Sequence, residues 1–245
     1  SLADVRDQLI TRLAARFPAK WKDLYESNAD AAAYSPDGAG VARRRLKNLA
    51  LRYLVEYLES ADPPLALRMI DAQMSDADNL NDRLVALNLV VDLQSIDDVQ
   101  RRERIEAFYQ RYRNEAGVVD LWFSTQAGCQ LPGTLQTIEM LESHPAFDIK
   151  NPNKVRALYG GFVQNSLRHF HAADGTGYRF FADRVLKIDR LNPQVAARLA
   201  TQLTRFQRVD SKRADLMRGA LRSIDADGAS KDLREVVTKG LAGDP

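Results

Sequence analysis

Cysteine and histidine are both scarce in this chain of 245 residues, and their scarcity excludes several kinds of chemistry. The lone cysteine, Cys129, has no second cysteine with which to form an intramolecular disulfide, which fits a reducing compartment. The histidines are His144, His169 and His171, and none stands near Cys129 in a recognisable nucleophile–base pattern. We therefore expect Cys129 to be a packing or surface residue rather than a nucleophile. A core of this size needs neither a disulfide nor a metal to fold.

An excess of charge of one sign is also missing. The 35 Lys and Arg residues and 33 Asp and Glu residues leave a net charge of +2, which is too even for a main partner that is nucleic acid or an anionic membrane. We interpret the arginine-rich runs at residues 43–45 and 101–104 as solvated helix faces. No apolar run approaches the roughly 20 residues that cross a bilayer, and the first ten residues, with Asp4, Arg6 and Asp7, do not form a signal peptide. We expect a cytoplasmic protein, and the missing initiator Met suggests a part of something longer.

Glycine and proline are few as well, and strand-type alternation is almost absent. The 13 glycines and 9 prolines fall below the roughly 12% of average composition. Apolar residues recur instead at helical intervals, most clearly in residues 43–58. The predicted apolar stripe of that helix consists of Leu46, Leu49, Ala50, Tyr53, Leu54, Tyr57 and Leu58.

Helix-breaking and helix-capping residues between the periodic segments predict about twelve helices, joined by short connections. Short connections make neighbouring helices pack antiparallel, and such pairs stack into a superhelix. We therefore predict an all-α fold of the HEAT or ARM type, although no clean sequence repeat is present. The linker-like residues 34–40 are too short for a boundary, so we predict a single domain over residues 1–245. The expected helices are residues 3–16, 21–27, 43–58, 65–74, 82–93, 95–113, 117–126, 134–142, 152–165, 176–190, 193–206, 211–223 and 231–241.

The polar segment HAADGTGY, residues 171–178, interrupts the helical pattern and invites two chemical interpretations. His169 and His171 with Asp174 would be a metal site, but two residues apart on a helix their rings point in different directions. The glycines around Thr176 would form a phosphate loop, but the P-loop spacing and its preceding strand are both missing. We prefer a structural turn in which His171 and Asp174 bond to backbone and both glycines take positive φ.

Nucleophile signatures are absent too, because the chain has no Gly-x-Ser-x-Gly segment. Aromatic residues lie at helical spacing, and we expect them in the core rather than on a surface that stacks nucleic-acid bases. They are Tyr53, Tyr57, Phe108, Tyr109, Trp122 and Phe123.

Asn-Pro opens two helices, since Asn suits the N-cap and Pro the first helical position. The segments that follow are NPNKVRALYGGFVQNSLRHFHAADGTGYRF (residues 151–180) and NPQVAARL (residues 192–199). Together with RRRLKNLALRYL (43–54) and VVDLWFSTQA (118–127), they resemble the C-terminal helical domain of bacterial aminopeptidase N, the zinc alanyl-aminopeptidase family. Small departures stand at Gly160-Gly161 for Gly-Ala, Asn165-Ser166 for Asn-Pro, and Thr176 for serine.

The resemblance implies a helical superhelix that packs against a thermolysin-like catalytic domain and closes the active site into a cavity. Zinc would belong to that domain, because this chain has neither HExxH nor the family's Gly-x-Met-Glu-Asn motif. Carried over by motif, Arg156, Gln194 and Arg198 would line the cavity and contact peptide. The alternative is that both arginines pair with acids within the domain, for example near Asp174 or Asp183.

The leading hypothesis is therefore a noncatalytic domain of a zinc aminopeptidase that releases N-terminal residues in peptide catabolism. Its partners would be the parent's catalytic domain and peptide substrates, and the isolated chain is expected to be inactive. One alternative is a free-standing helical-repeat scaffold that binds a protein on its concave face. A second alternative, a helical nucleic-acid binder using the arginine runs, is disfavoured by the balanced charge.

Overall fold

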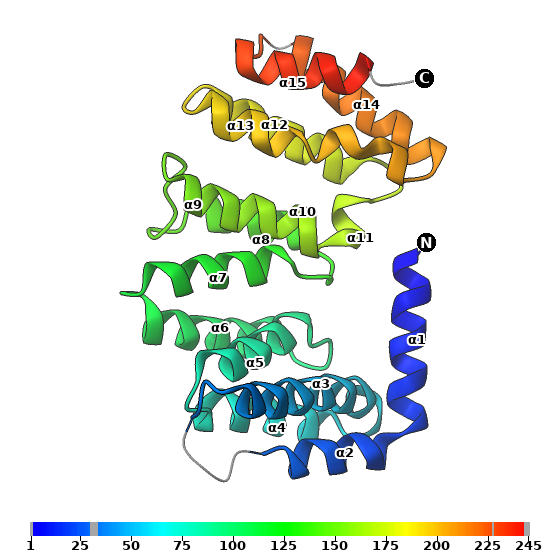
Figure 1. Ribbon diagram of the computed structural model, residues 1–245, viewed down its shortest axis with the longest axis vertical. Helices are drawn as coiled ribbons and strands as arrows, with labels where there is room; N and C mark the ends of the chain where they lie inside the picture. The colour runs from blue at the N-terminus through cyan, green and yellow to red at the C-terminus, as the bar shows by residue number, and fades with distance from the viewer. Residues whose placement is uncertain (1, 30–33, 227, 243–245) are drawn as a thin grey trace. The chain divides into compact units, whose positions relative to one another are not determined.

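The computed structural model describes residues 2–29, 34–226 and 228–242, which are helices and short connections without any strand (Figure 1). The chain divides into two compact units, Ser1–Arg111 and Tyr112–Pro245. Each unit has its own buried apolar core, and each is described below by itself.

The N-terminal unit is built from consecutive helices, and α3 to α6, within residues 38–112, begin at polar caps. Asp37 accepts a hydrogen bond from the Gly40 amide at 2.6 Å, and Asn79 accepts one from the Asp82 amide at 3.0 Å. These bonds satisfy amides that a helix start leaves without partners. The helices are α1 (Leu2–Arg16), α2 (Pro18–Ser27), α3 (Gly38–Ala61), α4 (Pro63–Asp76), α5 (Leu80–Asp92) and α6 (Asp98–Tyr112).

The C-terminal unit has a similar design with more irregular helices. The elements are α7 (Ala116–Ala127), α8 (Thr134–Glu142), α9 (Pro152–Val155), the π turn η1 (Arg156–Gly160), α10 (Gly161–Asn165), α11 (Leu167–Phe170), α12 (Thr176–Asp189), α13 (Pro193–Ala200), the 3-10 turn η2 (Leu203–Arg208), α14 (Ser211–Ala226) and α15 (Lys231–Ala242). Its core centres on aromatic rings in edge-to-face contact, such as Phe170 with Tyr178 at 5.2 Å and with Phe181 at 5.6 Å. Such pairs add about 0.5–1.5 kcal/mol each to the burial of their area.

Most predicted helices are present. Helix α3 begins at Gly38, within the residues interpreted as linker-like, and the four-residue helix α11 was not predicted. Two predicted helices also differ internally. The helix expected at 193–206 ends at Ala200, and a 3-10 turn follows in which Arg205 has the non-helical values φ −86° and ψ 26°. The helix expected at 152–165 is present from end to end, but its middle is the π turn η1.

The predicted apolar stripe of α3 is wrong at its first two members. Leu46 and Leu49 are 44% and 46% exposed, whereas Lys47 and Asn48 are buried. The physical reason lies on α5, where the buried carboxylate of Asp82 accepts hydrogen bonds from the Lys47 ammonium and, at 2.7 Å, from the Asn48 amide. These bonds turn the polar residues inward and leave the two leucines on the surface.

The same cluster joins three helices of the N-terminal unit. Gln73 on α4 donates to the Asn48 side-chain oxygen at 2.9 Å and to the Asp82 backbone carbonyl at 3.0 Å. A buried charge is tolerated only when it is paired and hydrogen-bonded, and Asp82 meets both conditions. The Lys47–Asp82 ion pair is therefore a structural centre of this unit.

Candidate functional site

Arg156 stands at the first position of the π turn η1. Asn151 caps the helix by accepting from the Asn153 amide at 2.9 Å, and Pro152 occupies the first turn. The Arg156 side chain is exposed, and its guanidinium donates to the Asn153 side-chain oxygen. π turns are uncommon and occur often at functional sites. The arginine is thus held at a helix irregularity with part of its guanidinium free for other contacts.

Gln194 and Arg198 lie on the exposed face of α13. Asn192 caps that helix by accepting from the Val195 amide at 3.1 Å. The two side chains are one helical turn apart, and the opposite face is buried through Ala196, Ala197, Leu199 and Ala200. Residue spacing therefore predicted their common face correctly. Within the described residues, no hydrogen bond or ion pair joins either side chain to Arg156.

The acids suggested as partners for these arginines have other contacts. Asp183 pairs at 3.1 Å with both Arg184 and Lys187. Asp174 accepts from the Thr176 amide at 3.0 Å and from its hydroxyl at 2.6 Å. These bonds hold the pKa of Asp174 below its usual range. In the structure, therefore, neither Arg156 nor Arg198 pairs with Asp174 or Asp183.

Arg184 is a cation of the C-terminal unit that pairs with several acids at once. Its guanidinium is 2.9 Å from Glu139 and 2.9 Å from Glu142, and it lies over the Phe180 ring at 3.8 Å. Side-chain exposure of Arg184 is only 10%, so these contacts stabilise the packing of α8 on α12.

The turn at residues 171–178 is structural, as predicted, but its details differ. Gly175 has φ 73°, a left-handed value that favours glycine. Gly177 does not have positive φ; glycine is needed there because a Cβ would lie 2.1 Å from the His169 carbonyl oxygen. The α12 backbone thus packs directly on the preceding segment, which a spacing argument cannot reveal.

His171 bonds to backbone through its amide, which donates to the Leu167 carbonyl at 3.0 Å, but its imidazole bonds to a side chain. Its Nδ1 lies 2.7 Å from the Tyr178 hydroxyl, and its carbonyl accepts from Arg213 at 2.7 Å. Burial lowers the pKa of His171, and the nearby Arg213 lowers it further. Burial also raises the pKa of Tyr178 to about 12. At neutral pH the pair is uncharged and joins α12 to the turn.

Two features are absent from the part of the chain that the structure describes. No group of three His, Cys, Asp or Glu side chains there is placed to hold a metal ion. No described helix has both the length and the apolar character that crossing a bilayer requires.

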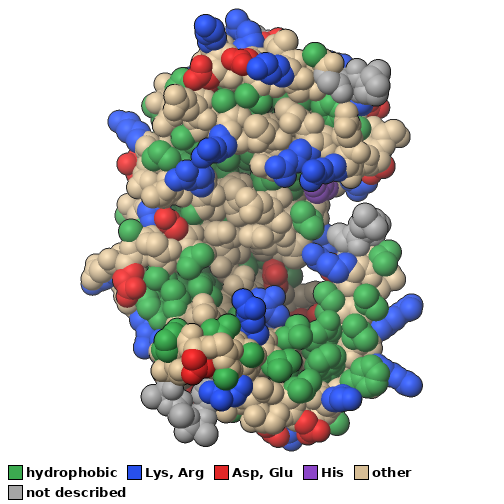
Figure 2. Space-filling view, viewed as in Figure 1, with side chains coloured by type: hydrophobic (Ala, Val, Ile, Leu, Met, Phe, Trp, Pro, Cys, Tyr) green, Lys and Arg blue, Asp and Glu red, His purple; other side chains and the backbone are tan. Residues whose placement is uncertain are grey.

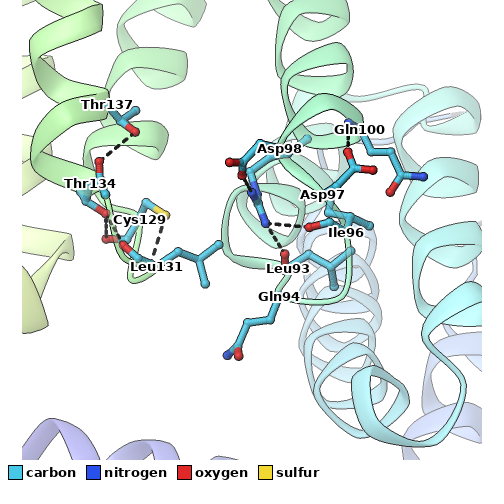
Figure 3. Close-up of polar contacts among 12 residues, drawn as sticks. Leu93, Gln94, Ile96, Asp97, Asp98, Gln100, Cys129, Leu131, Thr134 and Thr137 are labelled. Carbon is cyan, nitrogen blue, oxygen red and sulfur yellow. Dashed lines mark hydrogen bonds and ion pairs between the residues drawn. The ribbon is translucent and has the colours of Figure 1, made fainter.

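The arginine runs are not uniformly solvated, in contrast to our interpretation. Arg44 is buried, donates to the Ser35 carbonyl at 2.8 Å and lies over the Tyr34 ring at 4.5 Å. Arg101 donates to the Leu93 and Ile96 carbonyls at 2.6 and 3.3 Å, as Figure 3 shows at the labelled acceptors. Arginine spacing alone could not separate these inward side chains from their exposed neighbours.

Cys129 belongs to a turn that precedes α8. Its carbonyl accepts from the Ser166 hydroxyl at 2.7 Å. The same carbonyl accepts from the Thr134 hydroxyl at 3.2 Å, and the Cys129 sulfur accepts from the Leu131 amide at 3.4 Å (Figure 3). The half-buried cysteine is thus part of the local packing, in agreement with its predicted role.

A groove of 570 Å³ between α3 and α5 in the N-terminal unit was missed from the sequence. Figure 2 shows basic and hydrophobic side chains together over the region where these helices lie in Figure 1. The sequence signal was the spacing of Arg45, Leu49 and Arg52 at intervals of four and three, but the stripe interpretation placed Leu49 in the core. The groove is lined by Val41, Arg44, Arg45, Asn48, Leu49, Arg52, Asn81, Leu84, Val85 and Asn88.

Helices paired in this way, without strands in the described residues, define a helical-repeat domain, and comparison with known proteins gives its family. Residues 1–242 match a family model described as "Domain of unknown function (DUF3458_C) ARM repeats", and the chain belongs to that family. The predicted all-α, ARM-like fold class is thereby confirmed. The family match spans both compact units, and the single domain over residues 1–245 stays a prediction.

The relatives are bacterial aminopeptidases. The chain is 32% identical over 243 residues to aminopeptidase N of Escherichia coli strain K12, covering 99% of this chain and 27% of that protein. It is 33% identical to aminopeptidase N of Caulobacter vibrioides over 243 residues, covering 98% of this chain and 27% of that protein. The crystal structure of Legionella pneumophila aminopeptidase A in complex with aspartic acid superposes with a TM-score of 0.87 at 28% identity, covering 98% of this chain and 28% of that one.

These matches confirm the resemblance to the helical domain of bacterial aminopeptidase N. The chain spans about a quarter of the length of the relatives it matches.

Proposed function

We propose that this chain is the noncatalytic C-terminal helical domain of a cytoplasmic zinc aminopeptidase that releases N-terminal residues from peptides. The observation that carries the proposal is that nearly the whole chain aligns with only about a quarter of aminopeptidase N proteins. The remaining three quarters would hold the catalytic domain, as an intramolecular partner. A zinc ion in that domain would supply the hydrolytic chemistry, and the described residues of this chain hold no metal-binding group.

Within the larger enzyme, the domain caps the active-site cavity, limits access to peptides and contacts the substrate. Arg156, Gln194 and Arg198 are the residues proposed for that contact. All three are exposed, and the two arginines have no acidic partner among the described residues. An arginine fork suits a peptide carbonyl or carboxylate, and Gln194 supplies both a donor and an acceptor beside Arg198.

The test of this role is Arg198→Ala in the full-length protein that contains the domain. We expect KM for unblocked peptides to rise about three- to tenfold with little change in kcat, because the contact binds substrate and transition state alike. Arg222→Ala is the matched control, because Arg222 is exposed on α14 and its substitution removes the same charge. An unchanged KM in Arg198→Ala would show that this side chain does not reach substrate.

A second test addresses the whole chain. The 245 residues alone should not hydrolyse alanyl-nitroanilide and should hold no stoichiometric zinc by metal analysis. Turnover that a chelator abolishes would defeat the noncatalytic assignment. A reading frame without an upstream HExxH segment would favour the free-standing scaffold instead.

A further inference from the structure

The groove between α3 and α5 has the same residue pattern on both of its walls. On each helix a polar, an apolar and a second polar residue follow one another at intervals of four and three. They are Arg45, Leu49 and Arg52 on α3, and Asn81, Val85 and Asn88 on α5. Residues at such intervals lie along one face of an α-helix. Each wall therefore presents polar ends and an apolar middle.

The two walls are in register. Lys47 bonds to Asp82, and Glu59 accepts from the Gln94 amide directly after α5, so both contacts join residues 35 apart and the two walls run in the same direction. Asp82 bonds to Lys47 and Asn48, which are 35 and 34 residues before it. A similar offset sets the arginines of α3 opposite the asparagines of α5 and Leu49 opposite Val85. The arginines are seven residues apart, so the two polar ends are separated by about 10 Å, or two helical turns.

The positive charge of the groove is not neutralised. Arg45 and Arg52 are exposed and form no ion pair within the described chain, and no lining residue is acidic. Arg44, in the wall of the groove, is buried with its Nε atom lacking any hydrogen-bond partner there. By contrast, Arg104 in the same unit pairs with Asp71 at 2.7 Å. An anionic occupant would provide the acidic partners that the exposed Arg45 and Arg52 lack.

We propose that this groove binds an amphipathic helix of a partner protein, with acidic side chains seven residues apart and apolar side chains between them. Such a helix repeats its face every seven residues, so its carboxylates reach Arg45 and Arg52 while its apolar residues rest on Leu49 and Val85. An extended peptide fits less well. Acids about 10 Å apart in a strand are three residues apart, and they point to opposite sides.

This proposal concerns the N-terminal unit and does not depend on peptidase activity. The contacts proposed for peptide substrate are on η1 and α13 of the C-terminal unit. Binding can therefore be measured on the 245-residue chain itself, and its failure would leave the proposed function untouched.

The probe is a fluorescein-labelled, Ala-rich peptide of about 18 residues, long enough to populate a helix. It is acetylated and amidated, carries two Glu seven residues apart, and has Leu at the third and fourth positions after the first Glu. Fluorescence anisotropy gives Kd for wild type and for Arg45→Gln/Arg52→Gln. The control is Arg12→Gln/Arg102→Gln, which removes the same charge from exposed positions on α1 and α6.

We expect saturable binding that weakens about tenfold in Arg45→Gln/Arg52→Gln, consistent with the loss of two exposed charge pairs. The control variant should stay within about twofold of wild type. The reversed variant Arg45→Glu/Arg52→Glu should prefer a peptide with Lys in place of both Glu. This reciprocal change would show that the charges of the groove select the ligand.

Four outcomes would overturn the proposal. They are no saturable binding, an equal loss in the control variant, equal binding of a peptide with Gln in place of Glu, and tighter binding of a non-helical acidic peptide with a free C-terminal carboxylate. A concentration-dependent dimer in sedimentation that Arg45→Gln/Arg52→Gln abolishes would assign the groove to a second copy of this chain instead.

Discussion

The buried ion pair between Lys47 and Asp82 gives the sharpest prediction about stability. Side-chain exposure is 11% for Lys47 and 1% for Asp82. Substitution Lys47→Met keeps most of the side-chain volume but leaves the carboxylate buried without its countercharge. Breaking a buried pair in this way costs about 3–5 kcal/mol. Asn48 still donates to the carboxylate at 2.7 Å, so we expect a value near the lower end, about 3 kcal/mol.

Urea unfolding measures this loss unit by unit. The chain has two tryptophans, one in each unit: Trp21 stacks on Tyr53 at 4.3 Å, and Trp122 is buried in α7. In protein labelled with 5-fluorotryptophan, two fluorine resonances should therefore report the two units separately. With a slope of about 2 kcal/mol per molar urea, the Trp21 midpoint should fall by about 1.5 M in Lys47→Met.

The control substitution is Lys22→Met, which removes an exposed pair whose atoms are 3.8 Å apart. Exposed pairs contribute little, so the Trp21 midpoint should shift by less than about 0.3 M. The double variant Lys47→Met/Asp82→Leu should regain at least part of the loss, because no unpaired charge remains. A Trp21 midpoint in Lys47→Met within about 0.3 M of wild type would refute the reasoning.

Two further predictions concern the C-terminal unit. Gly177→Ala should destabilise it by about 1–3 kcal/mol, because the new Cβ would meet the His169 and Phe170 carbonyl oxygens at 2.1 and 2.5 Å. Gly219→Ala in α14 meets nothing within 4 Å and should instead stabilise by about 0.5–1 kcal/mol; a loss as large as that of Gly177→Ala would contradict the packing argument. The pKa of His171 in the folded protein lies below the ordinary value of 6.5, so the unfolded chain binds the proton more readily. The contribution of His171 to the stability of this unit should therefore be fully present above about pH 6.5 and should be lost as the pH falls below it. The loss should be smaller in His171→Gln. The measurement is the urea midpoint reported by Trp122 at about pH 5 and at about pH 7. An identical pH dependence in that variant would assign the effect to other groups.

Much of the fold follows from local signals. Asn-Pro at residues 151–152 and 192–193 marks two helix starts, and in each case the asparagine caps an amide as expected. The periodic segments give most helix bounds within a few residues. The exposed face that Gln194 and Arg198 share also follows from their spacing.

What the sequence does not reveal depends on contacts between distant residues. The inward turn of Lys47 requires Asp82, 35 residues later, so periodicity alone put Leu46 and Leu49 on the wrong side of α3. Gly177 is needed because another segment's backbone packs against it, not because of its own φ. The unneutralised arginines of the groove became visible only when α5 was placed beside α3.

The π turn η1 has a consequence for reading the sequences of relatives. Such a turn holds one residue more than an α-helical turn, so the residues before Arg156 and after Gly160 follow separate periodicities. The 152–165 helix can accommodate a one-residue insertion without breaking, because its two ends keep their own faces toward the core. An aminopeptidase relative with a regular helix here should therefore align with a single gap between residues 156 and 160. The role of a side chain beyond that gap should be transferred only after the residue register has been shifted by one.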